Sequence, residues 1–130
     1  MSLFRTLFAG LVAVILLGSA PASAAEWKEF TPEALAAAQA DGKPILVDVF
    51  AAWCSVCRAQ NPILTKLTRE PKYKDLLVLK ADFDTQKDQL KPLNVRSQST
   101  LIVFKGDKEL DRSAGDTSEI SIEGMLDKTL

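Results

Sequence analysis

The most constraining feature of this 130-residue chain is the segment Trp53-Cys54-Ser55-Val56-Cys57, which directly follows an apolar run from Ile45 to Phe50. Its two cysteines are the only ones in the sequence. A structural disulfide stabilises most when it closes a long loop, and this pair would close almost none. A zinc site needs four ligands, and the chain has no histidine and no third cysteine to complete one. The spacing therefore predicts a pair that cycles between dithiol and disulfide.

Residues 1–24 have the pattern of a cleaved signal peptide. Arg5 provides a positive start, Leu7–Gly18 is an apolar run of twelve residues, and Ala22-Ser23-Ala24 supplies a small-x-small cleavage pattern. The mature chain is then expected to begin at Ala25. An uncleaved N-terminal anchor is the alternative, although the apolar run is shorter than the roughly 20 residues of a membrane span.

Export implies an oxidising compartment, and for a signal of bacterial type we expect the periplasm. Residues 25–130 are enough for one compact domain and not for two. Without Arg5, the 16 basic residues fall to 15 against 17 acidic ones, a net charge of −2. This balance points to neither a nucleic acid nor a membrane surface as partner. We expect a monomer with no stable membrane insertion after cleavage.

The first half of the mature chain predicts a helix, a strand and a second helix. Thr31 is a typical N-cap before Pro32, and the alanine-rich helix that follows should stop by Gly42. The run Ile45–Phe50 reads as a central strand that is covered on both faces. A helix is expected from Cys54 to about Arg69, kinked at Pro62, with an inner face made of Ile63, Leu64 and Leu67.

The second half predicts three more strands and two more helices. Strands are expected at Leu76–Phe83, Thr100–Phe104 and, after the turn Gly106-Asp107, Lys108–Arg112. A short polar helix should span Asp84–Leu93. A last helix after Gly115 should share one apolar face, formed by Ile122, Met125, Leu126 and Leu130. The alternation predicts a single α/β domain whose mixed sheet has helices on both faces.

With these elements in place, the chain resembles the thioredoxin family over nearly all of Glu26–Leu130. The family pattern of an aromatic residue and Cys-x-x-Cys after a buried strand matches Trp53 to Cys57. Its helix proline matches Pro62, its buried acid matches Asp48, and the lysine on the neighbouring strand matches Lys80. The segment from Asn94 to Phe104 resembles the family's substrate-facing loop and the strand after it. The resemblance implies a thioredoxin fold and an enzyme that acts on protein disulfides.

Ser99 departs from the family, which normally has a cis-proline at this position. A cis bond before another residue costs about 2.5–4 kcal/mol, so we expect a trans bond unless the surroundings of Ser99 hold it cis. Three interpretations of the change are open: neutral divergence, altered substrate recognition, or a capacity to bind a metal or cluster that the proline ring would hinder.

The two cysteines are assigned different roles. Cys54 should lie at the N-terminus of its helix, where free backbone amides and the helix dipole favour a thiolate. We expect Cys54 to be the attacking nucleophile and Cys57, one turn further and more buried, to be the resolving thiol.

Five other residues complete the predicted site. Burial within an apolar strand should raise the pKa of Asp48 toward neutrality, so that it can take the Cys57 proton, and pairing with Lys80 should temper that shift. A buried ion pair without a catalytic role is the alternative. Trp53 either contacts substrates or fills the edge of the core. From the resemblance, Ser99 and Thr100 would bind an extended substrate segment through backbone hydrogen bonds.

The residues between the cysteines bear on the direction of electron flow. Strongly oxidising family members carry a histidine there, whereas Ser55 and Val56 are uncharged, which favours a lower reduction potential. We therefore predict a periplasmic reductant or electron relay, supplied with electrons by a transmembrane thiol reductase and needing neither cofactor nor metal.

Three alternatives stay open at this point. One is an oxidase or isomerase of disulfides. Another is a metal or iron–sulfur module that uses Cys54 and Cys57 across a dimer, motivated by Ser99. A copper-handling factor is disfavoured, because Met125 is far along the chain and there is no histidine to add a ligand.

Overall fold

The computed structural model describes residues 18 and 24–130. The expected signal peptide, Met1–Ala24, therefore lies outside the described residues apart from Gly18 and Ala24. Within residues 18 and 24–130, no helix has both the length and the hydrophobicity that crossing a membrane requires.

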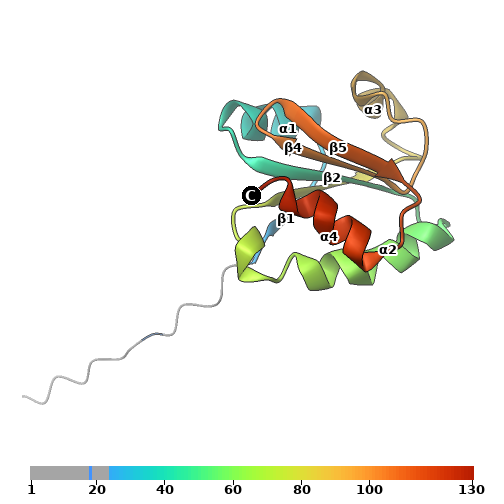
Figure 1. Ribbon diagram of the computed structural model, residues 1–130. Coiled ribbons are helices and arrows are strands. Elements are labelled where there is room, and N and C mark those ends of the chain that lie inside the picture. The colour runs from blue at the N-terminus through green and yellow to red at the C-terminus, as the bar shows by residue number, and fades with distance from the viewer. Residues whose placement is uncertain (1–17, 19–23) are drawn as a thin grey trace, which may run out of the picture.

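A mixed sheet forms the centre of the molecule (Figure 1). Its strands are β1 (Glu26–Glu29), β2 (Pro44–Phe50), β3 (Leu77–Asp82), β4 (Thr100–Lys105) and β5 (Lys108–Ala114). They lie in the order β1-β3-β2-β4-β5. β1 and β2 are each parallel to β3, whereas β4 is antiparallel to β2 and to β5. The apolar β2 is the middle strand, as its composition predicted.

Helices cover both faces of this sheet, which confirms the predicted α/β architecture. Figure 1 shows α1 (Pro32–Ala40) and α3 (Lys87–Leu90) on one face, and α2 (Ser55–Leu67) and α4 (Glu119–Asp127) on the other. The start of α1 is as predicted, because the Thr31 hydroxyl accepts a hydrogen bond from the backbone N–H of Ala34 at 3.0 Å. Two short 3-10 turns, Pro71–Tyr73 and Lys91–Leu93, precede β3 and follow α3.

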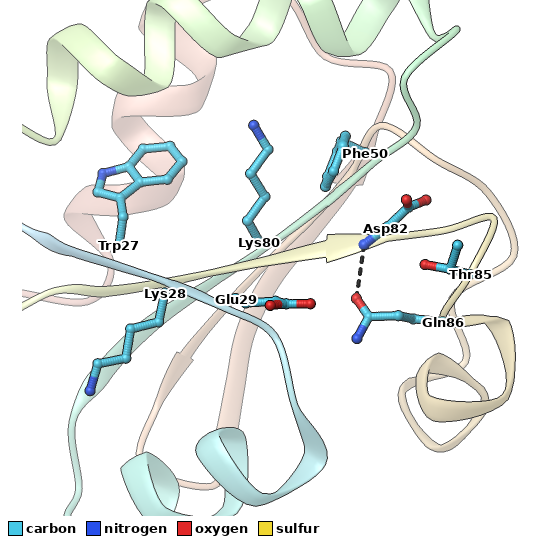
Figure 2. A pocket seen from close by; sticks show the side chains of 8 residues that line it. All are labelled: Trp27, Lys28, Glu29, Phe50, Lys80, Asp82, Thr85 and Gln86. Atoms are coloured by element: carbon cyan, nitrogen blue, oxygen red, sulfur yellow. Dashed lines mark hydrogen bonds between the residues drawn. The ribbon is translucent and has the colours of Figure 1, made fainter.

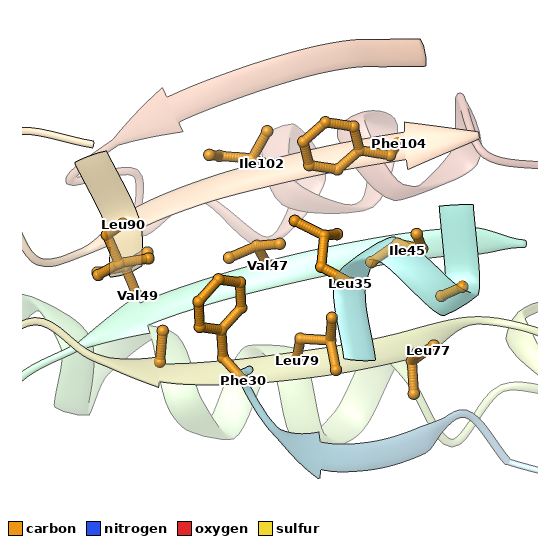
Figure 3. Close-up of a cluster of buried hydrophobic side chains, with 12 residues drawn as sticks. Phe30, Leu35, Ile45, Val47, Val49, Leu77, Leu79, Leu90, Ile102 and Phe104 are labelled. Carbon is orange, nitrogen blue, oxygen red and sulfur yellow. The ribbon is translucent and has the colours of Figure 1, made fainter. Parts of the chain in front are cut away.

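Alternation along β2 divides the hydrophobic core into two layers. Ile45, Val47 and Val49 belong to the layer shared with α1 and α3, which Figure 3 shows. Leu46 belongs to the layer beneath the other two helices, where it is joined by Leu64, Leu67, Ile122, Met125 and Leu126. Since side chains alternate with a period of two along a strand, Asp48 points to the same side as Leu46, toward α2.

Three features of the fold differ from the sequence prediction. β1 was not predicted; it is an edge strand whose position depends on pairing with β3, because its own residues are mostly exposed. The polar helix expected at Asp84–Leu93 is only the four residues of α3, followed by a 3-10 turn. Leu130 does not share the buried face of α4, because the helix ends at Asp127 and Leu130 is 64% exposed.

Packing of α2 on the sheet gives a stability prediction. Replacing Leu64, which is fully buried, with alanine should lower the free energy of unfolding by about 2–5 kcal/mol through lost contacts and a residual cavity. Urea unfolding of the oxidised protein measures this change. The control is Ile120→Ala on α4, where the side chain is 84% exposed and the change should stay within about 0.5 kcal/mol. Equal losses in the two variants would contradict the described core.

Candidate active site

The turn from β2 into α2 positions the cysteine pair. The backbone N–H of Cys54 donates to the carbonyl of Ala51 at 3.1 Å, which closes the turn. Cys54 is the N-cap of α2, and its Sγ accepts a hydrogen bond from the backbone N–H of Cys57 at 3.1 Å. The two cysteines form a disulfide. When this bond is reduced, the Cys54 sulfur lies among the free amides at the start of a 13-residue helix, a position that favours an anion.

Cys54 and Cys57 are buried to a similar extent. Cys54 is 4% exposed and Cys57 is 7% exposed, so the expectation that Cys57 is the more buried residue is wrong. The difference between them lies in their surroundings. Cys57, and not Cys54, lines a hollow of about 450 Å³ that also has Asp48 and Lys80 in its wall. A group in this hollow, including water, can therefore approach the Cys57 side of the pair.

Asp48 is a buried carboxyl group under the cysteine-bearing helix. The residue is 4% exposed, and the register of the parallel strands aligns it with Lys80. Burial raises its pKa from 3.8 to about 6, while the charge of Lys80 acts in the opposite direction. This is the direction that the apolar setting of Asp48 predicted, since desolvation disfavours the charged form. At neutral pH the carboxylate is the main form, yet it takes a proton readily.

Lys80 acts on Asp48 through space. The ion pairs that the described residues form do not include one between these two side chains, so the direct pairing that we expected is not observed. The Lys80 ammonium instead lies 4.6 Å from the centre of the Phe50 ring and donates to Asn61 Oδ1 at 3.5 Å. Figure 2 shows the lysine side chain between Trp27 and Phe50, extended toward α2. The charge of Lys80 thus limits the rise in the pKa of Asp48 without a direct ion pair between the two side chains.

Trp53 lies at the surface and does not fill the edge of the core. It is 60% exposed, and its indole N–H donates to Asp84 Oδ2 at 2.7 Å. This bond joins the residue before the cysteine pair to the segment that follows β3. The indole is therefore held in place beside the disulfide while its surface stays available to a partner.

Ser99 ends the loop that leads into β4, and Thr100 is the first residue of that strand. Both are buried, and the peptide bonds of the described residues, including the one before Ser99, are trans. Ser99 has a φ of 62°, in the left-handed region that residues other than glycine rarely adopt. Its N–H donates to the carbonyl of Val49, the residue after Asp48, at 2.7 Å. The loop is therefore attached directly to the strand that leads to the cysteines.

Polar residues near the site were missed from the sequence, among them Asp84 and Asn61. Asp84 follows the carboxyl end of a predicted strand, and β2 ends at the same edge of the sheet. The predicted topology therefore indicated that Asp84 would lie near Trp53, with which it forms a hydrogen bond. Asn61 follows Cys57 by one helical turn, which was a signal that it shares the same face. The contact of its amide with Lys80 had no signal in the sequence, because the two residues lie on different elements, α2 and β3.

Side chains that could bind a metal ion are not clustered in the described part of the chain. Residues 18 and 24–130 contain no group of three or more His, Cys, Asp or Glu side chains that could hold a metal ion. An iron–sulfur or metal site built on Cys54 and Cys57 would therefore have to take its remaining ligands from elsewhere, such as a second copy of the chain.

A reversible disulfide at a helix N-terminus, with a titratable carboxyl behind it, is suited to exchange reactions with other thiols and disulfides. These features define the class of protein: a thiol–disulfide oxidoreductase built on a five-stranded mixed sheet.

Comparisons with known proteins give the family. The thioredoxin family model matches residues 26–128. The chain is 37% identical over 84 residues to a thioredoxin of Chlamydia muridarum, a match that covers 65% of this chain and 80% of that one. The crystal structure of Trxlp from Edwardsiella tarda EIB202 superposes with a TM-score of 0.75 at 42% identity, over 78% of this chain and 98% of that one. The chain belongs to the thioredoxin family.

More distant structures support the fold alone. Reduced Schistosoma mansoni thioredoxin has a TM-score of 0.67 at 24% identity, over 83% of this chain and all of that one. The family match confirms the expected thioredoxin fold and enzyme class. The attacking and resolving roles of the two cysteines stay predictions, as do the roles of Asp48, Lys80, Trp53, Ser99 and Thr100.

The raised pKa of Asp48 predicts a pH-dependent stability. Because the folded protein binds this proton more tightly than the unfolded chain, Asp48 destabilises the fold by about 3 kcal/mol above pH 6, and this penalty vanishes below pH 3.8. Asp48→Asn should therefore be more stable than the wild type by up to that amount at pH 7, and nearly equal to it at pH 3.5. Urea unfolding of both oxidised proteins across this range measures the difference. A difference that does not change with pH would contradict the assignment.

Proposed function

We propose that this thiol–disulfide oxidoreductase works as a reductant of protein disulfides outside the cytosol. The observation that supports it best is the position of Asp48, whose carboxyl shares a hollow with Cys57 and has a pKa of about 6. Reduction of a substrate requires the resolving thiol to lose its proton at the moment of attack. A nearby carboxylate that accepts a proton close to neutral pH meets this requirement.

The proposed reaction has two exchange steps. In the first, the Cys54 thiolate attacks one sulfur of the substrate disulfide, so that a mixed disulfide forms and the other substrate sulfur leaves as a thiolate, which takes up a proton. In the second, Asp48 takes the Cys57 proton, directly or through water in the hollow, and the Cys57 thiolate attacks Cys54 Sγ. The second substrate sulfur leaves as a thiolate and takes up a proton from protonated Asp48 or from water, and the Cys54–Cys57 disulfide forms. Two electrons thus pass to the substrate, with one proton that Cys57 supplies and one from solvent.

The compartment and the electron donor are also part of the proposal. The expected signal peptide, Met1–Ala24, supports export to the periplasm. In such an oxidising compartment a reductant must itself be reduced again by a dedicated donor. A transmembrane thiol reductase meets this need, with the exported protein acting as a monomeric carrier between donor and substrate.

The cysteine assignment predicts a trapped intermediate. When the full-length Cys57→Ser protein is expressed in a bacterium, it should accumulate as a mixed disulfide with its partners, because the resolving thiol is absent. After alkylation of free thiols, the complexes should appear in the periplasmic fraction on non-reducing gels and disappear with dithiothreitol. Mass spectrometry should find Ala25 at their N-terminus.

The matched control is Cys54→Ser. This variant should trap no partner, and its reductase activity should be lower than that of the wild type by a factor of about a hundred or more. Trapping through Cys57 in that variant would reverse the roles of the two cysteines. Complexes confined to the cytoplasm, with residues 1–24 retained, would contradict export.

The direction of electron flow predicts a low reduction potential. Redox-buffer titration of residues 25–130 at neutral pH should give a value near or below ~−270 mV, whereas a value above ~−180 mV would make the protein an oxidase or isomerase. Val56→His should raise the potential by ~30 mV or more, because an imidazolium beside Cys54 stabilises the reduced form. The uncharged Val56→Gln is the control and should leave the potential nearly unchanged.

A further inference from the structure

The side chain of Gln60 is a buried amide on the helix that carries the cysteines. It is 1% exposed and lies on the inner face of α2, in line with Cys57 and Leu64. Its Nε2 donates to the backbone carbonyls of Ser99 at 3.2 Å and of Asp116 at 2.8 Å. Since only the nitrogen end of an amide can donate to two carbonyls, these acceptors determine its orientation. Gln60 therefore joins α2 to two loops that are far away in the sequence.

One of these loops has an unusual backbone. Ser99 has a φ of 62°, which a proline could not adopt because its ring fixes φ at about −65°. Three hydrogen bonds to its backbone hold Ser99 in this conformation. Its N–H donates to the Val49 carbonyl at 2.7 Å, and its carbonyl accepts from the Gly115 N–H at 3.0 Å and from Gln60 Nε2. The first two bonds come from strand ends. Among the hydrogen bonds of the described residues, only the one from Gln60 links the loop to the helix of the cysteine pair.

Packing alone does not account for an amide at this position. Gln60 Oε1 is buried and has no hydrogen-bond partner among the described residues, which is unfavourable for folding. An unbranched apolar side chain such as methionine would fill a similar volume without leaving an acceptor unpaired. What the amide provides, and methionine does not, is the pair of hydrogen bonds to the loops.

We propose that Gln60 is a positioning residue that holds the Ser99–Thr100 loop against the cysteine pair, in the conformation that receives an extended polypeptide segment. This inference rests on the proposed function and on the expectation that this loop binds the substrate through its backbone. Such binding needs fixed N–H and C=O directions. Because the N–H and C=O of Ser99 are bonded within the protein, Ser99 fixes the directions of the backbone groups beside it, in the half-buried Ser97 and Gln98. A small disulfide needs only the Cys54 sulfur. Gln60 therefore sets a preference for disulfides in polypeptides over small ones.

The test compares two substrates in Gln60→Met. With insulin as the protein disulfide, kcat/KM should fall about tenfold, mainly through a higher KM, while with bis(2-hydroxyethyl) disulfide it should stay within about twofold of the wild type. The control is Ala59→Met, which places the same residue on the exposed side of the same helix and should change neither value. Gln60→Leu provides a second variant if the first does not fold.

Amide hydrogen exchange gives a readout that does not depend on activity. In Gln60→Met the Ser99 N–H should exchange at least about tenfold faster, while the N–H of Leu46 in the central strand stays protected. Equal losses of activity on both substrates, or no loss on insulin, would overturn the role of Gln60 while leaving the proposed function intact. A wild-type protein that reduces neither substrate would overturn the proposed function and this inference with it.

Discussion

The parallel pairing of β2 with β3 is the constraint on which the site depends. Its register places Asp48 opposite Lys80, and the alternation of side chains turns both toward α2. The same strand ends at Phe50, and the short turn after it makes Cys54 the cap of that helix. A slip of one residue in this register would exchange the two faces and carry Asp48 to the layer beneath α1. The acid, the lysine and the sulfurs are therefore placed by one set of backbone hydrogen bonds.

A second consequence of this pairing is that the site is built mainly from strand ends. Asp84 follows β3, Ser99 precedes β4 and Gly115 follows β5, and each makes a hydrogen bond near the point where β2 gives way to α2. Rigid strands thus fix the backbone around the cysteines, while the connecting segments supply polar groups. This division lets loop residues such as Ser99 change without loss of the sheet, because the strands keep their own hydrogen bonds.

Much of the fold was predictable because its signals are local. The apolar run of β2, the cap at Thr31 and the turn at Gly106-Asp107 each specify an element from neighbouring residues alone. The cysteine pair was predictable for the same reason, since the five consecutive residues Trp53–Cys57 are enough to indicate a redox-active pair. The apolar residues on both sides of Asp48 predicted that it would be buried. Burial in turn predicted that its pKa would be raised.

What was missed depends on contacts between distant segments. The edge strand β1 has no hydrophobic pattern of its own and exists through its partner strand. The amide of Gln60 meets carbonyl groups 39 and 56 residues away, which no local pattern reveals. Lys80 lies opposite Asp48 as expected, but its ammonium contacts Phe50 and Asn61, and the ion pairs of the described residues do not include one with Asp48. In each case the outcome was decided by side-chain geometry that only the assembled fold defines.

The burial of Asp48 has a consequence for how the protein meets its partners in an acidified environment. Histidine is the side chain that ordinarily titrates between pH 5 and 8, and this sequence has none. The Asp48 carboxyl, with a pKa of about 6, titrates within that interval, and it is enclosed below the surface. In the proposed mechanism, mild acid therefore protonates the acceptor of the Cys57 proton inside the protein, and not on the face that a partner meets. Disulfide exchange then slows at its second step, after the mixed disulfide with the partner has formed.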